Sequence, residues 1–116
     1  MSNTIAENGE FVLQDNGFLT ARVIIANQRG LHARAAAKFV KTAEKYKAEI
    51  MVKRGEVSCF SCAGEQVSGH SIMGLMMLAA SIGTELYIGI RGADPDLAHN
   101  ALTELVTLVQ QKFGEE

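Results

Sequence analysis

The sequence contains few residues of several types, and each shortage excludes a class of protein. With no Trp, one Pro and two Cys among 116 residues, it has neither the disulfide framework of a small secreted domain nor the composition of a Pro-rich disordered segment. Aromatic residues make up only 6% of the chain, so we expect a core of Val, Ile, Leu, Met and Ala. No apolar run approaches the roughly 18 residues that a membrane-spanning helix needs, so we expect no membrane partner.

Clusters of Lys and Arg are also missing. The formal net charge is −2 and the sequence pI about 5.9, whereas a nucleic-acid-binding domain usually carries a basic patch, so we expect no nucleic-acid partner. The polar, acidic stretch 1–17 lacks the basic start and apolar centre of a signal peptide, which favours a cytoplasmic protein. We predict a flexible extension over residues 1–17 and one domain over residues 18–116, which is expected to be a monomer.

Hydrophobic periodicity divides the domain into strands and helices. Period-2 alternation predicts strands over 19–25, 48–53 and 85–91, with a weaker one within 62–68, whereas helical spacing predicts helices over 33–46, 71–80 and 94–109. Asp94 and Pro95 form a typical helix start, and Gly83 is expected to stop the second helix. The order β-α-β-β-α-β-α, with strands that have one polar face, indicates an α+β sandwich with helices on one side of an antiparallel or mixed sheet.

The most unusual motif is Gly30-Leu31-His32-Ala33-Arg34, in which a loop ends and a helix begins beside a histidine. The first backbone N–H groups of a helix, here those of Ala33 and Arg34, lack internal acceptors and lie at the positive end of the helix dipole. Such a place binds anions and favours neutral imidazole, the nucleophilic form. Arg34 can also grip phosphate oxygens, so the motif favours phosphoryl chemistry at His32. The simpler interpretation is a solvated surface histidine.

Three segments carry a family resemblance. The stretch 27–40, NQRGLHARAAAKFV, the stretch 71–78, SIMGLMML, and the stretch 83–97 occur in that order along the chain. They resemble the active-site segment, the regulatory-serine helix and the last strand with its following turn in the HPr family, the histidine phosphocarriers of the bacterial phosphotransferase system. The resemblance covers roughly residues 18–113. It implies an open-faced β-sandwich, in which three helices cover one face of a four-stranded antiparallel sheet.

The resemblance implies a role for each motif. His32 matches the histidine that takes a phosphoryl group from Enzyme I, itself charged from phosphoenolpyruvate, and passes it to a IIA-type acceptor, while Arg34 matches the arginine that steadies this group. Ser71 matches a serine that an ATP-dependent kinase/phosphorylase modifies in some bacteria. The family's apolar patch for partner proteins matches Ile72, Met73 and Met76. The implied protein is a transfer intermediate in sugar transport rather than a stand-alone enzyme, and it uses neither cofactor nor metal.

Four features depart from the family pattern. Ala35 stands where the family usually has Pro, and His70 stands where Lys often precedes the serine. The connection between the second and third strands is longer, around residues 56–63, and the N-terminal extension is atypical. His70 and the extension favour a regulatory branch of the family, such as the nitrogen-related phosphotransferase system, over bulk sugar uptake.

Other residues allow different functions. Cys59 and Cys62 form a C-x-x-C that could be redox-active or half of a zinc site with His70 as third ligand, although two reduced thiols are the simpler interpretation. His99 fits a polar helix face. An RNA-binding sheet would need exposed aromatic residues, which are scarce here. A regulatory phosphoprotein, modified at Ser71 and acting mainly by binding other proteins, is the main alternative to a carrier.

Overall fold

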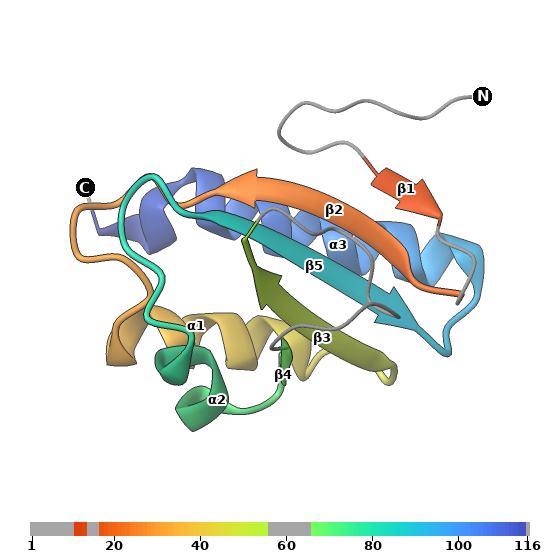
Figure 1. The fold of residues 1–116 in the computed structure, drawn as a ribbon. Helices are drawn as coiled ribbons and strands as arrows, with labels where there is room; N and C mark the ends of the chain where they lie inside the picture. The colour runs from red at the N-terminus through yellow and green to blue at the C-terminus, as the bar shows by residue number, and fades with distance from the viewer. Residues whose placement is uncertain (1–10, 14–16, 56–65, 116) are drawn as a thin grey trace.

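The computed structural model describes residues 11–13, 17–55 and 66–115. Its elements follow the predicted order, with one additional strand before them (Figure 1). The strands are β1 (Phe11–Leu13), β2 (Leu19–Ile24), β3 (Glu49–Arg54), β4 (Gln66–Ser68) and β5 (Glu85–Arg91). The helices are α1 (Ala33–Ala43), α2 (Ile72–Met77) and α3 (Pro95–Gln110), and a short 3-10 turn, η1 (Lys112–Gly114), follows α3.

The strands form one antiparallel sheet in the order β1-β2-β5-β3-β4. The central strand is β5, in which Ile90 faces Leu19 of β2 on one side and Ile50 of β3 on the other. The helices lie on one side of this sheet, with α1 and α3 along its length and α2 beside α1 (Figure 1). The predicted open-faced α+β sandwich is therefore confirmed.

The core lies between the sheet and the helices. Ala21 and Val23 of β2 are buried at alternate positions, and Ala36, Phe39 and Val40 of α1 are buried at helical spacing, as the two periods predicted. The remaining helices contribute further residues that are fully buried: Leu75, Ala101, Leu102, Leu105 and Val109. The packing fixes where α1 begins, and this position matters for the site described below.

The start of α3 follows the predicted capping pattern. The side-chain oxygen of Asp94 accepts a hydrogen bond from the backbone N–H of Leu97 at 2.9 Å, and Pro95 is the first helical residue. A proline costs nothing at this position, because its missing N–H would have no acceptor inside the helix.

Three features differ from the sequence prediction. The first helix ends at Ala43 and not near residue 46. β1 lies in the stretch 1–17, which was expected to extend from the domain, yet it pairs with β2 and adds a fifth strand to the sheet. The second helix ends at Met77, short of the predicted end at residue 80. It ends early because Ala79 adopts the left-handed conformation (φ 54°), while the Arg54 guanidinium binds the carbonyl oxygens of Leu78 and Ala79 at 2.8 and 3.2 Å.

Some predictions concern the segment between β3 and β4. The strand expected within 62–68 is present as β4 over its last three residues. Cys59 and Cys62 lie outside the described residues. Within the described ranges, no helix combines the length and apolar character that crossing a bilayer requires, and no three His, Cys, Asp or Glu side chains gather to hold a metal ion.

Candidate functional site

The loop before α1 is fixed against the turn that follows α2. Gly30 has a positive φ of 67°, and the N–H of Leu31 donates to the Ala80 carbonyl at 2.8 Å. A Cβ atom at position 30 would lie 2.4 Å from the same carbonyl oxygen, so both the backbone conformation and the available space require glycine. Leu31 is buried, and the chain therefore enters α1 in a defined position.

His32 is the N-cap of α1. Its backbone is extended (φ −82°, ψ −178°), its carbonyl accepts a hydrogen bond from the N–H of Ala36 at 2.8 Å, and its side chain makes no capping hydrogen bond. The N–H groups of Ala33 and Arg34 open the helix and have no acceptor within it. The imidazole therefore lies beside the positive end of the helix dipole, and the predicted helix start at this residue is confirmed.

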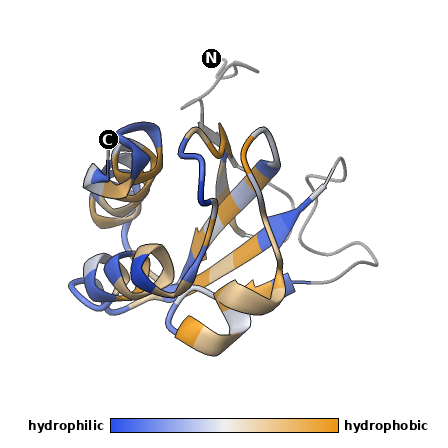
Figure 2. Ribbon diagram, turned by 90° about the vertical axis from the view of Figure 1, so that its left-hand side faces the viewer, coloured by the Kyte–Doolittle hydropathy of each residue, from blue (hydrophilic) through white to orange (hydrophobic). Residues whose placement is uncertain are grey.

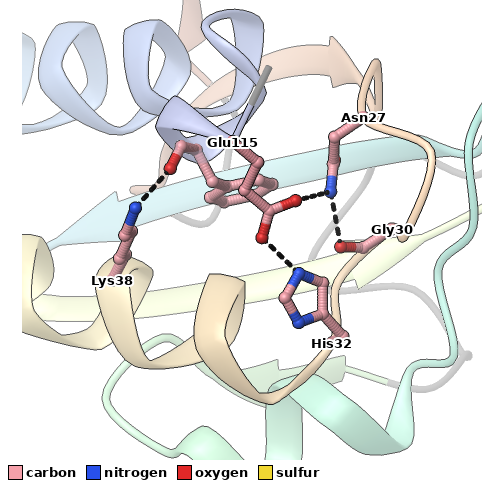
Figure 3. A network of polar contacts seen from close by, with 6 residues as sticks. Asn27, Gly30, His32, Lys38 and Glu115 are labelled. Carbon is pink, nitrogen blue, oxygen red and sulfur yellow. Dashed lines mark hydrogen bonds and ion pairs between the residues drawn. The ribbon is translucent and has the colours of Figure 1, made fainter.

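A carboxylate from the other end of the chain contacts the His32 ring (Figure 3). The Nε2 atom of His32 pairs with Oε2 of Glu115, and the Asn27 side chain holds the other oxygen of that carboxylate. Asn27 Nδ2 donates to Glu115 Oε1 at 3.0 Å and to the Gly30 carbonyl at 2.9 Å. The side chains of His32 and Glu115 are only 18% and 11% exposed, so the contact is largely shielded from water.

The residues after α3 fold back over α1 and bring Glu115 to the site. Lys112, Phe113 and Gly114 have successive positive φ angles of 59°, 55° and 74°. This conformation costs about 1–2 kcal/mol for each residue other than glycine, so other contacts must hold the turn. Phe113 is fully buried, and the Lys38 ammonium group of α1 donates to the Phe113 carbonyl at 2.6 Å (Figure 3).

A basic hollow of about 370 Å³ opens beside this network, and its lining comprises Gln28, Arg29, Arg34, Lys38, Gly114 and Glu115. Three of the lining side chains are cationic and one is anionic, so the hollow attracts negatively charged groups. The Arg34 side chain is exposed and pairs with no group in the part of the chain that the structure describes. Its planar fork of N–H donors is therefore available to an anion.

The Glu115 carboxyl gives the network a pH dependence. Burial acts to raise its pKa, but hydrogen bonds from His32 and Asn27, together with the charge of Arg29, outweigh burial and lower the pKa below its usual value of 4.5. Because the pKa is lower in the folded state than in the unfolded state, ionised Glu115 stabilises the fold above pH 4.5. This contribution is lost as the pH falls from that value through the lowered pKa.

Urea unfolding of wild type and Glu115→Ala at two pH values measures this dependence. We expect the variant to be less stable than wild type at about pH 5, and the difference in the free energy of unfolding to shrink at about pH 2.5. A difference that is the same at both pH values would show that the charge of Glu115 does not contribute to stability.

A second predicted site lies at the start of α2. Ser71 is the N-cap of this helix, and its side-chain oxygen accepts a hydrogen bond from the N–H of Gly74 at 2.9 Å. Leu75 and Leu78 are buried. The residues that we call the apolar patch are 41–72% exposed: Ile72, Met73, Met76, Met77 and Ile82. Figure 2 shows the hydrophobic character of α2 at the lower edge of the molecule. The sequence prediction named Ile72, Met73 and Met76 but did not include the exposed Met77 and Ile82.

The three histidines have different surroundings. His70 is exposed, and its Nε2 lies 3.1 Å from the Ala48 carbonyl oxygen. His99 is exposed on α3, where a polar helix face was predicted. His32 contacts the Glu115 carboxylate. The sequence prediction missed both Asn27 and Glu115; Glu115 is 83 residues from His32 and follows no motif that would mark it.

The fold and the site define a class of protein. A histidine at a helix start, beside a basic hollow on the surface of a small open-faced sandwich, is suited to bind an anionic group where a second protein can reach it. The sequence matches the family described as "PTS HPr component phosphorylation site" over residues 19–108. The chain therefore belongs to the HPr family and is a phosphocarrier of the phosphotransferase system.

Individual relatives agree with this family. The chain is 48% identical over 84 residues to "Phosphocarrier protein HPr" of Pseudomonas aeruginosa. The matched region covers 72% of this chain and 86% of the relative. It is 43% identical over 97 residues to the protein of that name from Neisseria meningitidis serogroup A, and this match covers 84% of this chain and 97% of the relative. Among solved structures, it is similar to HPr-C-His from Thermoanaerobacter tengcongensis, with a TM-score of 0.66, 38% identity, and 84% and 97% covered. The HPr structure from Bacillus anthracis str. Ames gives a TM-score of 0.66 and 34% identity, with 80% and 98% covered.

Proposed function

We propose that His32 accepts a phosphoryl group from Enzyme I charged by phosphoenolpyruvate and passes it to a IIA-type acceptor in the cytoplasm. The contact between His32 Nε2 and Glu115 supports this proposal most strongly, because it leaves Nδ1 as the ring atom that can bond to phosphorus. In this proposal, Arg34 and the backbone N–H groups of Ala33 and Arg34 hold the phosphoryl oxygens. The protein then acts as a transfer intermediate, and the transfer needs neither cofactor nor metal.

A two-step transfer assay tests this proposal. The full chain is incubated with phosphoenolpyruvate and a catalytic amount of Enzyme I, the donor is removed, and a IIA-type acceptor is added. We expect an acid-labile, base-stable phosphate on the chain in the first step and its loss to the acceptor in the second. An acid-stable label that stays on the chain would contradict the carrier role and would favour the regulatory alternative.

The apolar patch is the surface that we propose for docking of Enzyme I and the acceptors, through Ile72, Met73 and Met76. Exposed apolar area of this kind commonly marks a binding surface, and flexible Met side chains adapt to several partners. The patch adjoins the site, since the N–H of Leu31 donates to the carbonyl of Ala80 in the turn that follows α2. A partner on the patch would therefore lie close to His32.

We also propose that a kinase/phosphorylase modifies Ser71. A phosphate on this N-cap residue would lie at the positive end of α2, and its charge beside the apolar patch would repel acidic partner surfaces. The alternative function is that of a regulatory phosphoprotein in a nitrogen-type phosphotransferase system, which acts mainly by binding. His70, directly before Ser71, and the N-terminal extension favour that alternative.

Ser71→Ala separates the structural role of this residue from the regulatory one. The variant loses the 2.9 Å capping hydrogen bond to Gly74, so we expect its free energy of unfolding to fall by about 1 kcal/mol. With the cognate kinase and labelled ATP, we expect acid-stable label on wild type and none on the variant. Wild type that takes no label would refute regulation at Ser71, whereas the loss of stability would still show the capping role.

A further inference from the structure

The contact between His32 and Glu115 has a defined direction, because Asn27 holds Glu115 from the other side. An amide Nδ2 group can only donate, so Glu115 Oε1 accepts from Asn27 and Oε2 faces the His32 ring. An ionised carboxylate has no proton to give, and the lowered pKa of Glu115 keeps this carboxyl ionised at neutral pH. The proton in the contact therefore lies on Nε2, and the lone pair of the neutral ring lies on Nδ1.

We propose that Glu115, oriented by Asn27, is a positioning residue that fixes the His32 ring in the Nε2–H tautomer and so presents Nδ1 to the incoming phosphorus. This inference rests on the proposed carrier function and deepens it. It assigns a role to two residues that lie in the loop before α1 and in the turn after α3, neither of which reacts itself.

The fold around Glu115 is arranged to keep the carboxylate at the ring. Two left-handed residues, Lys112 and Phe113, turn the chain back, and the buried Phe113 and the Lys38 hydrogen bond hold the turn. Asn27 is fully buried and uses its Nδ2 group on Gly30 and Glu115, while its own side-chain oxygen receives no hydrogen bond among the described residues. Packing alone gives no reason for this unsatisfied oxygen, but an amide that must donate to Glu115 does.

The choice of partner supports the same role. Arg29, Arg34 and Lys38 all line the hollow beside Glu115, yet the carboxylate makes its direct contacts with His32 and Asn27. A carboxylate that served only to neutralise the basic hollow would pair with a cation. Glu115 instead makes no direct contact with the Arg34 guanidinium, which stays available to a phosphoryl group, and bonds to the ring nitrogen that is not expected to react.

Glu115 also has a role during the transfer step, in which the His32 ring becomes positively charged. The Nδ1 lone pair forms a bond to phosphorus, while the bond between phosphorus and the leaving atom of the donor breaks and its electron pair returns to the donor. The ring becomes cationic as this happens, and the Nε2 proton remains between His32 and Glu115. The carboxylate then stabilises the developing positive charge, and the ring returns to its neutral form when the acceptor removes the phosphoryl group.

Glu115→Gln gives the sharpest test, because Asn27 fixes how the new amide is oriented. Asn27 Nδ2 still needs an acceptor, so the Gln oxygen faces Asn27 and the Gln NH₂ group faces His32. The ring must then accept on Nε2 and carry its proton on Nδ1, which blocks the reacting atom. Long-range ¹H–¹⁵N NMR of the histidine-labelled, unphosphorylated chain at about pH 8, where imidazole is ordinarily neutral, reports the tautomer directly.

We expect Nε2–H in wild type, Nδ1–H in Glu115→Gln, and an average of both tautomers in Glu115→Ala. With the chain as the phosphoryl acceptor, the kcat of Enzyme I should fall by about 10-fold for Glu115→Ala and by about 100-fold for Glu115→Gln. The KM of Enzyme I for the chain should change little. A purely structural role predicts the opposite order, because Gln replaces Glu more closely than Ala does. Glu104→Gln is the matched control, since it removes a carboxylate that pairs with Lys45, beyond the far end of α1.

The results separate this inference from the proposed function. Identical ¹⁵N shifts in wild type and Glu115→Gln would overturn the inference, and so would a Gln variant that transfers faster than the Ala variant. If wild type shows the Nε2–H tautomer but takes no phosphoryl group from cognate Enzyme I, the carrier function fails and the role of Glu115 in transfer fails with it. The expected tautomers together with the expected order of rates would support both.

Discussion

An alanine in place of His32 is expected to abolish phosphoryl uptake from Enzyme I, with the rate reduced by at least about 1,000-fold. The substitution removes the nucleophile, and neither Arg34 nor a backbone N–H group can form the covalent intermediate in its place. The fold should survive the loss of the contact with Glu115, because the His32 side chain makes no capping hydrogen bond and its backbone geometry is open to alanine. Incorporation of label from phosphoenolpyruvate, followed over time, measures the rate.

His99→Ala is the matched control for this loss. His99 is exposed on α3 and is placed in neither the site nor the apolar patch, so the variant should take up label at the wild-type rate. Circular dichroism of both variants would establish that each is folded. Acid-labile label on His32→Ala at a rate near that of wild type would refute His32 as the carrier residue.

Gly30→Ala is expected to lower the free energy of unfolding by about 2–4 kcal/mol, a large effect for the addition of one methyl group. The new Cβ would lie 2.4 Å from the Ala80 carbonyl oxygen and 2.9 Å from the Cα of Ser81, and both are backbone atoms that cannot rotate away. Relief of the clash must break the hydrogen bond from Leu31 to Ala80 or displace the loop, and either change moves the carbonyl that Asn27 binds.

A second glycine separates the clash from the cost of the backbone conformation. Gly83 also has a positive φ (88°), but a Cβ atom there would meet nothing within 4 Å. Gly83→Ala should therefore cost only about 1 kcal/mol, the penalty for a left-handed alanine alone. Urea unfolding of the two variants measures the difference, and equal losses would show that the Gly30 contact with Ala80 does not constrain the loop.

Local patterns predicted most of the fold and the place of the candidate residue His32 at a helix start. Alternation predicted β2, β3 and β5, helical spacing predicted α1 and α3, and Asp94 with Pro95 marked a helix start that the structure confirms. The position of His32 at the start of α1 could be predicted for the same reason, since the change from period 2 to period 3.6 falls at that point. These features depend on neighbours within a few residues, and such neighbours are visible in a sequence.

The partners of His32 could not be predicted, because they depend on contacts between distant segments. Glu115 follows α3 among ordinary polar residues, and only the left-handed turn at Lys112 and Phe113 directs it toward the ring. The sequence around Asn27 is typical of a loop, where an exposed side chain is expected, yet Asn27 is fully buried. The early end of α2 was missed for a related reason, because Arg54 of the distant strand β3 binds the carbonyl oxygens of Leu78 and Ala79, which follow the helix.

Phosphorus NMR of the ¹⁵N-histidine-labelled wild-type chain, recorded after incubation with phosphoenolpyruvate and catalytic cognate Enzyme I, tests the central claim most directly. A carrier at His32 predicts a single acid-labile phosphohistidine signal whose coupling to nitrogen-15 identifies Nδ1 as the bonded atom. No phosphorus signal, or only an acid-stable phosphoserine signal, would contradict it.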